Sequence, residues 1–314
     1  MYRRELPPER LASFARSVEG AGLDELWVVE DCFWSGGMTA ATAALAATES
    51  LTVGLGIAPA VVRNAAIAAM EIAGIARMFR GRFIAGFGHG VGDWMHQIGA
   101  FPSSQLAALD ETMTVVRRLL RGERLTFHGS HVDLDDVELV FPPDDVPMVL
   151  SGVTGPRSLA VTARAADGVL LPEGSSAAYV RAANAALGDE TLACVVYVLF
   201  ALSDDRAEAA AAVSDAIDHF AAGSRDERLA KLGIVDDVDP ADRADRYAVV
   251  GDAARCAEAV AELHDAGADS VVLVPCLGTS FEAQLAQVER AGRELKPLLG
   301  QTSPPNSGRR SSAP

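Results

Sequence analysis

Lysine is almost absent from this chain of 314 residues, since Lys231 and Lys296 are the only two. Acidic side chains outnumber basic ones by 43 to 27, which gives a formal net charge of −16. A surface of this sign repels nucleic acid and anionic membranes, so we expect neither as a partner. Any phosphate that the protein binds must therefore be held by local arginines and backbone amides.

Paired cysteines and long apolar runs are also missing. The four cysteines lie far apart with no Cys-x-x-Cys pair, which offers no disulfide framework and fits a reducing compartment. The longest apolar run, residues 192–202, is too short to span a bilayer, and no apolar segment follows Arg3 and Arg4 as in a signal peptide. The histidines show no metal-ligand spacing. We expect a cytoplasmic protein without a catalytic metal.

Strand-like and helix-like segments alternate along nearly the whole chain, which is typical of a parallel sheet. The apolar runs predict seven strands: 26–29, 51–57, 83–88, 146–150, 168–171, 193–201 and 270–275. The looser alternation over 124–139 predicts a β-hairpin.

The length and the strand–helix alternation predict one (β/α)₈ TIM barrel over residues 1–300. Only residues 1–6 precede the first helical segment, so strand one of the barrel is expected to be short or missing, or the true start to lie upstream. Residues 301–314 are rich in Ser, Pro and Arg and are expected to form a disordered tail.

The stretch from residue 82 to residue 94 is the strongest functional signal. A buried strand ends there in closely spaced glycines, among them Gly88 and Gly90, which flank His89. Glycine lets the backbone approach a ligand closely, and α/β enzymes place their sites where strands end. His89 is therefore the preferred polar active-site residue, able to hydrogen-bond a cofactor or carry a proton. The alternative is a tight turn that merely needs glycine.

Five motifs in order resemble the luciferase-like oxidoreductases, which include bacterial luciferase, FMN-dependent monooxygenases and coenzyme F420 enzymes. The branch that they resemble contains methylenetetrahydromethanopterin reductase and F420-dependent glucose-6-phosphate dehydrogenase. The motifs are Gly22 to Asp31, Val53 to Pro59 with Arg63-Asn64, Gly86 to Gly90, Ser151 to Arg157, and Ala166 to Val169.

The resemblance implies a TIM barrel that binds FMN or F420 at the carboxyl ends of its strands. It also implies a non-proline cis peptide bond behind the cofactor ring, at Gly56–Ile57 by position. Ser151, Gly152, Thr154 and Gly155 match the family's phosphate-binding turn. Free amides at a helix start hold anions well, and Arg157 or Arg63 could assist them; a structural ion pair is the alternative for Arg63.

The segments after the first and third of the seven strands contain further candidates. Asp31 is expected to orient the site or to form a salt bridge inside it, and Trp34 and Trp94 are candidate walls of the substrate pocket. Cys32 stands where related dehydrogenases have a histidine, and Val91 stands where the glucose-6-phosphate dehydrogenase is acidic. These departures argue against a sugar phosphate as the substrate.

The leading hypothesis is a flavin- or F420-dependent oxidoreductase that transfers hydride to or from a small organic substrate. Two alternatives remain open: a luciferase-type monooxygenase that uses reduced FMN and O₂, and a cofactor-binding homologue without catalysis. Homodimers are common in the family, so self-association is also possible.

Overall fold

The computed structural model describes residues 1–189, 191–223, 239 and 242–300. These residues form two compact units, and each is described by itself. The first unit comprises residues 1–19 and 24–170, and the second comprises residues 20–23 and 171 onward. All of the predicted site residues belong to the first unit.

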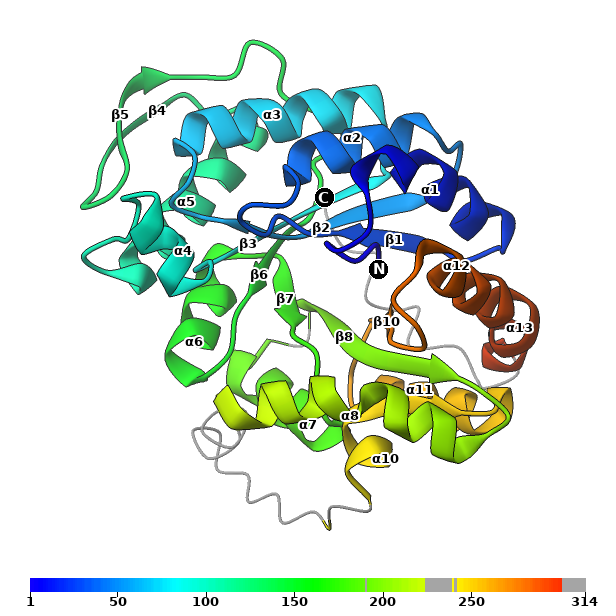
Figure 1. Ribbon diagram of the computed structural model, residues 1–314. Helices are drawn as coiled ribbons and strands as arrows, with labels where there is room; N and C mark the ends of the chain where they lie inside the picture. The colour runs from blue at the N-terminus through cyan, green and yellow to red at the C-terminus, as the bar shows by residue number, and fades with distance from the viewer. Residues whose placement is uncertain (190, 224–238, 240–241, 301–314) are drawn as a thin grey trace. The chain divides into compact units, whose positions relative to one another are not determined.

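The first unit alternates strands and helices in the predicted manner (Figure 1). Its elements are η1 (Pro8–Arg10), α1 (Leu11–Gly20), β1 (Glu25–Val28), α2 (Gly37–Ala46), β2 (Thr52–Pro59), α3 (Ala65–Met78), β3 (Phe83–Gly88), α4 (Gly92–Gln97), α5 (Gln105–Leu120), β4 (Leu125–His128), β5 (Asp133–Val137), β6 (Val149–Gly152), α6 (Pro156–Ala165) and β7 (Gly168–Leu171).

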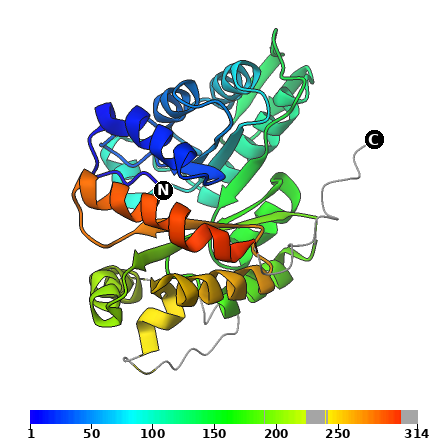
Figure 2. The same ribbon diagram turned by 90° about the vertical axis from the view of Figure 1, so that its right-hand side faces the viewer.

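Five strands of the first unit pair in parallel in the order β1-β2-β3-β6-β7. The antiparallel pair β4–β5 is the predicted hairpin. Helices α1, α2 and α3 lie along one side of β1, β2 and β3 in both of the first two views (Figures 1 and 2). Parallel strands all end on the same edge, so the loops after β1, β2, β3 and β6 come together there.

Close packing fixes the strands that carry the site. Trp27 on β1 is fully buried, and a Cβ on Gly54 of β2 would lie 2.3 Å from its indole ring. Glu19 at the end of α1 holds the turn before β2, because its Oε1 accepts hydrogen bonds from the backbone N–H groups of Glu49, Ser50 and Leu51. These bonds favour the ionised form and lower the pKa of Glu19.

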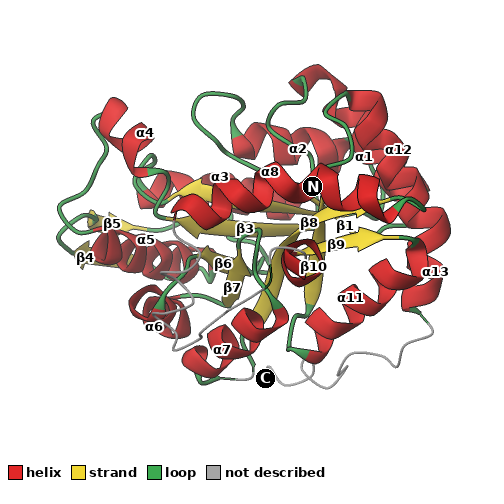
Figure 3. Ribbon diagram, turned by 60° about the horizontal axis from the view of Figure 1, so that its bottom comes forward, coloured by secondary structure: helices red, strands yellow, loops and turns green. Residues whose placement is uncertain are grey.

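The second unit follows the same alternation, with β10, β8 and β9 paired in parallel in that order. Its elements are α7 (Ala177–Leu187), β8 (Ala193–Leu202), α8 (Arg206–Gly223), α10 (Arg243–Tyr247), β9 (Ala248–Gly251), α11 (Ala253–Asp265), β10 (Ser270–Pro275), α12 (Phe281–Arg290), the π-helical turn η3 (Ala291–Leu295) and α13 (Lys296–Leu299) (Figure 3). Apolar side chains of α8, β8 and β9 form one buried cluster.

The α/β fold with parallel strands is confirmed, and each of the seven predicted strands overlaps an observed one. Strand β9 was not predicted. Residues 1–6 contain no strand, although the Tyr2 N–H donates to the Trp27 carbonyl at 2.8 Å. The predicted tail over 301–314 lies outside the described residues.

One local prediction needs correction, and one helix was not predicted. The strand expected at 146–150 is observed at Val149–Gly152, so Ser151 and Gly152 lie in β6 rather than in the turn after it. Residues 92–97, for which no element was predicted, form the short helix α4. No helix among the described residues is long and apolar enough to cross a membrane.

Candidate functional site

The carboxyl ends of β2, β3 and β6 bring the predicted cofactor residues side by side. Pro59 of β2 is in register with Gly88 of β3, and Gly88 is in register with Gly152 of β6. His89 follows Gly88 directly, and α6 begins four residues after Gly152. The structure therefore brings together three regions that lie far apart in the sequence.

Three glycines surround the side chain of Ile57. A Cβ on Gly152 would lie 2.3 Å from Cγ2 of Ile57, and a Cβ on Gly88 would lie 3.0 Å from its Cδ1. A Cβ on Gly86 would lie 3.3 Å from Cγ2 and 2.5 Å from the Leu55 carbonyl oxygen. Larger residues at these positions would push Ile57 or the strands apart. The glycines of β3 and β6 are thus needed to seat Ile57 at the strand ends.

The peptide bond Gly56–Ile57 is cis, as predicted. The bond Cys32–Phe33, in the loop after β1, is also cis, and the sequence analysis did not anticipate it.

His89 connects the end of β3 to the start of α6. Its Nε2 lies 3.1 Å from the Ser158 hydroxyl, while Nδ1 is buried without a hydrogen-bond partner among the described residues. Burial lowers the pKa of His89 below its ordinary value. Interaction with the backbone of Gln105 raises this pKa, but by a smaller amount. The lowered pKa favours the neutral imidazole over the protonated form.

The start of α6 is open to an anion. Gly155 precedes the helix with a φ of +81°, and Pro156 at the first helical position has no N–H. No side chain of the described residues caps this end, so the first-turn amides remain available, and the helix dipole favours negative charge there. Arg157 is exposed on the first turn and forms no ion pair among the described residues.

Ser151 and Thr154 flank this helix start in different settings. Ser151 is fully buried in β6, and its hydroxyl has no hydrogen-bond partner in the part of the chain that the structure describes. Thr154 is partly exposed in the loop between β6 and α6. A buried hydroxyl without a partner costs free energy, which a bound polar group would recover.

Arg63 takes part in an ion-pair cluster. Its guanidinium donates two hydrogen bonds to the Glu30 carboxylate and lies 3.0 Å from an Oε2 of Glu71. Glu30 also accepts from the Gly37 N–H and so ties β1 to the start of α2. Of the two roles left open for Arg63, the structure shows the ion pair.

Asp31, Trp34 and Trp94 lie together with a residue that the sequence analysis did not single out, Arg4. The Arg4 guanidinium donates to Asp31 at 2.8 Å and lies 4.6 Å from the centre of the Trp34 ring and 5.8 Å from that of Trp94. The two indoles are themselves 6.0 Å apart. The predicted salt bridge of Asp31 and the proximity of the two tryptophans are thus observed.

The described residues around Cys32 disfavour its thiolate form. Burial raises the pKa of its thiol, and the nearby carboxylates of Glu30 and Asp31 raise it further. A thiol in this setting stays protonated, which favours a wall of the site over a nucleophile. No three His, Cys, Asp or Glu side chains come together as a metal site within the described ranges.

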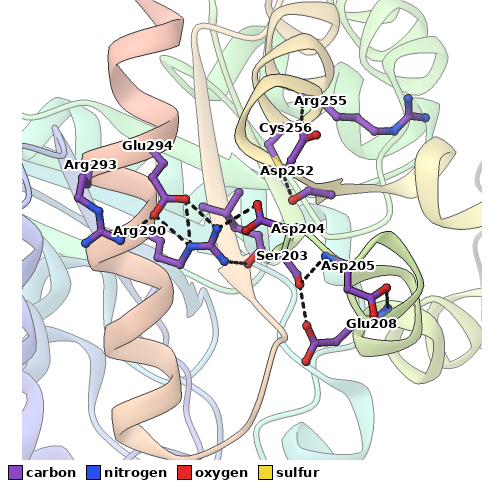
Figure 4. A network of polar contacts seen from close by, with 12 residues as sticks. Ser203, Asp204, Asp205, Glu208, Asp252, Arg255, Cys256, Arg290, Arg293 and Glu294 are labelled. Carbon is purple, nitrogen blue, oxygen red and sulfur yellow. Dashed lines mark hydrogen bonds and ion pairs between the residues drawn. The ribbon is translucent and has the colours of Figure 1, made fainter.

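The second unit contains a separate polar network at the end of β8 (Figure 4). Arg290 of α12 donates to the Leu202 carbonyl at 3.0 Å and pairs with Glu294 at 2.7 Å and with Asp204 at 3.5 Å. In the same region, burial raises the pKa of Cys256 to about 12. The side chains of this network bind one another, which indicates a structural role.

The family model and the similar proteins of known activity agree on one family. The model of the family described as luciferase-like monooxygenase matches residues 1–270. A 5,10-methylenetetrahydromethanopterin reductase of Methanolobus tindarius is 28% identical over 247 residues, which are 76% of this chain and 74% of the reductase. An F420-dependent glucose-6-phosphate dehydrogenase of Nakamurella multipartita is 26% identical over 183 residues, 54% of this chain and 53% of the dehydrogenase.

Two solved structures share the fold. The coenzyme F420-dependent tetrahydromethanopterin reductase of Methanopyrus kandleri aligns with a TM-score of 0.78 at 20% identity, covering 92% of this chain and 95% of the reductase. The oxygenating constituent of 3,6-diketocamphane monooxygenase of Pseudomonas putida, in complex with FMN, aligns with a TM-score of 0.70 at 15% identity, covering 93% of each chain.

Proposed function

Because the chain belongs to the family of luciferase-like monooxygenases, we propose that it is an oxidoreductase that uses coenzyme F420 or FMN to transfer a hydride to or from a small organic substrate. The observation that supports this proposal most directly is the glycine-lined seat of Ile57, which lies next to His89 and the open start of α6. The whole arrangement lies within the first unit.

The residues present suit a flat ring system with a phosphate-bearing tail. Gly86, Gly88 and Gly152 leave backbone rather than side chains around Ile57, so a planar group can approach the strand ends closely. Nδ1 of His89 and the hydroxyl of Ser151 are buried polar atoms that lack a partner in the described residues, and a ligand can satisfy both.

In this proposal the backbone of Gly56, the side chain of Ile57 and the glycines around it support the ring. Thr154, Gly155 and the first-turn amides of α6 hold the phosphate, with Arg157 supplying charge. When bound, such a cofactor supplies the redox chemistry by taking up or releasing a hydride. Ile57 and the two tryptophans keep water away from the reacting groups, and His89 holds or accepts a proton at Nδ1.

Titration of the purified protein with each cofactor tests the proposal. We expect one of them to bind with a dissociation constant of about 10 μM or below, as judged by its absorbance or fluorescence. If neither F420 nor FMN binds at such concentrations, the proposal is wrong.

The description of the family as monooxygenases favours a second candidate, oxygenation by reduced FMN and O₂. Oxygen uptake with reduced FMN and candidate substrates would identify this activity, whereas hydride exchange with F420 in the absence of oxygen would identify the first. Tight binding without turnover in both assays would leave a cofactor-binding homologue.

We also propose that the chain forms a homodimer through α3. Ile67, Met70 and Met78 are 47%, 54% and 63% exposed on one stripe of this helix, and a Cβ on Gly74 between them would meet no atom within 4 Å. The Phe141 ring lies beside the end of α3, 5.6 Å from the Arg77 guanidinium, and extends the apolar surface. A patch of this kind, with a glycine that admits a close backbone, suits a second copy across a two-fold axis.

A Met70→Glu variant is expected to be monomeric, because its carboxylates would be buried against one another in the dimer. Light scattering coupled to size-exclusion chromatography measures this, with Ile98→Glu, at an exposed position directly after α4, as the control that should remain dimeric. A monomeric unmodified chain at tens of micromolar would contradict the proposal.

A further inference from the structure

Arg4 contacts both Trp34, in the loop after β1, and Trp94, on α4. We propose that Arg4 is a positioning residue of the substrate site: it holds the Trp34 indole against Trp94, so that the pair forms a fixed wall for an apolar or aromatic part of the substrate. The expected effect of Arg4 on substrate binding rests on the proposed function, whereas its effect on the two indoles does not.

The segment that carries Arg4 is fixed at both ends. Tyr2 and Leu6 are 6% and 5% exposed, and the Tyr2 N–H donates to the Trp27 carbonyl of β1 at 2.8 Å. The Tyr2 hydroxyl donates to the Pro7 carbonyl at 2.6 Å, and its ring packs against Phe14. The Leu6 N–H closes the turn on the Arg3 carbonyl at 3.1 Å. Arg4 therefore projects from an anchored turn rather than from a loose end.

The guanidinium of Arg4 makes contacts in two directions. Asp31 and Glu5 accept its hydrogen bonds at 2.8 Å and 3.2 Å, which orients the group and balances its charge. Its carbon lies 4.6 Å from the Trp34 ring centre and 5.8 Å from that of Trp94, within the range of cation–π attraction for both. One side chain thus bridges both indoles.

The place of this contact in the sheet connects it to the site. Trp34 follows β1, and Trp94 lies on α4, which follows β3 and His89. Strand β2 lies between β1 and β3, so the segments that carry the two indoles follow the strands on either side of the one that carries Ile57. Ligands of parallel sheets bind at the carboxyl ends of the strands.

The chemistry of the wall indicates what it contacts. The Trp34 side chain is half exposed, at 50%, and so retains a free surface beside its partners. The charge of Arg4 is already matched by Asp31 and Glu5, so the wall offers an aromatic surface rather than a site for a phosphate or carboxylate. An exposed indole would otherwise sample several rotamers, and the Arg4 contact restricts it to one.

Tryptophan fluorescence tests the structural part without cofactor or substrate. The third tryptophan, Trp27, is fully buried, so quenching by acrylamide reports on Trp34 and Trp94. An Arg4→Ala variant is expected to raise the quenching constant about twofold because the indoles become mobile, and Arg4→Lys is expected to restore part of the difference because it keeps the cation. Arg3→Ala, a neighbouring surface change that also removes a partner of Glu5, should leave quenching unchanged.

Steady-state kinetics tests the role in the substrate site. Arg4→Ala is expected to raise KM about tenfold while kcat changes less than about threefold, because a misplaced wall weakens substrate binding rather than chemistry. The dissociation constant of the cofactor should not change. Unchanged quenching, or changed quenching with an unchanged KM, would overturn the inference. If the unmodified chain shows no turnover, the proposed function fails and the substrate role of Arg4 with it, whereas quenching still decides whether Arg4 fixes the indole pair.

Discussion

In a Gly152→Ala variant the dissociation constant of the cofactor is expected to rise at least about a hundredfold. The free energy of unfolding is expected to fall by about 2 kcal/mol. The added Cβ would lie 2.3 Å from Cγ2 of Ile57, a distance that real Cβ atoms do not show. Ile57 is β-branched and stiff at χ1, and Gly86 and Gly88 already pack against it, so it cannot turn away without displacing its neighbours. Any group supported by Ile57 would be displaced with it.

Chemical denaturation and cofactor titration of the same preparations measure the two effects separately. Gly20→Ala is the matched control, because a Cβ on Gly20 would meet no atom within 4 Å; it should leave cofactor affinity unchanged and should not lower the stability. Combining Gly152→Ala with Ile57→Ala removes the atom that the new methyl group would meet and should recover part of the stability. Wild-type cofactor affinity in Gly152→Ala would show that the seat of Ile57 does not belong to the binding site.

The sequence predicted this seat in part. The glycine spacing in 86–90 indicated that some group approaches the backbone closely, and the motif order placed Gly56–Ile57 and Gly152 in the same site. The sequence did not show that the approaching group is Ile57 of the chain itself. Which side chain fills the space above a glycine depends on strand register, and register between segments 30 and 65 residues apart leaves no local pattern.

Strand β9 was missed because its four residues, Ala248–Gly251, are too few to show a periodicity. They also follow the charged stretch 239–246, which resembles loop and helix more than the entrance to a strand. The start and end of β6 were misplaced for a related reason. Ser151 is polar and was assigned to the turn, yet it is fully buried in the strand, where tertiary packing overrides the local preference of serine.

The contacts of Arg4 cannot be predicted from a local sequence pattern. Its partners Asp31, Trp34 and Trp94 are between 27 and 90 positions away, and an arginine near the start of a chain has no distinctive neighbours. The anchored turn at Tyr2 and the tertiary contact between the loop after β1 and α4 bring these side chains together. Asp31 and the two tryptophans could be selected in advance because each follows a strand end, which is itself readable from hydrophobic runs.

Replacement of His89 by asparagine is expected to lower kcat/KM about a hundredfold, the range typical of a lost proton donor or acceptor. Asn cannot exchange a proton near neutral pH, although it can form hydrogen bonds to Ser158 and to a ligand. Cofactor affinity should therefore fall much less than turnover. His128→Asn, on the exposed hairpin β4–β5, is the control that should retain full activity.

The pH dependence separates this role from a purely structural one. Burial lowers the pKa of His89, so the neutral imidazole persists below the ordinary histidine pKa of about 6.5. If the neutral form is the active one, kcat/KM of the unmodified chain is level near neutral pH and falls on the acid side, and His89→Asn lacks this acid limb. A profile that keeps the same limb in His89→Asn would assign it to another group.

The stability of the protein should also depend on pH because of His89, and the direction of this dependence is defined. The pKa of His89 is lower in the folded than in the unfolded chain, so the unfolded chain binds the proton more readily. The free energy of unfolding of the unmodified protein therefore decreases as the pH drops through about 6.5, so the protein becomes less stable. The decrease is smaller in His89→Asn. Denaturation midpoints of both proteins, measured between about pH 5 and pH 8, test this without any cofactor. Equal slopes in the two proteins would mean that His89 is not buried as a neutral imidazole, and the proton-carrying role proposed for it would lose its physical basis.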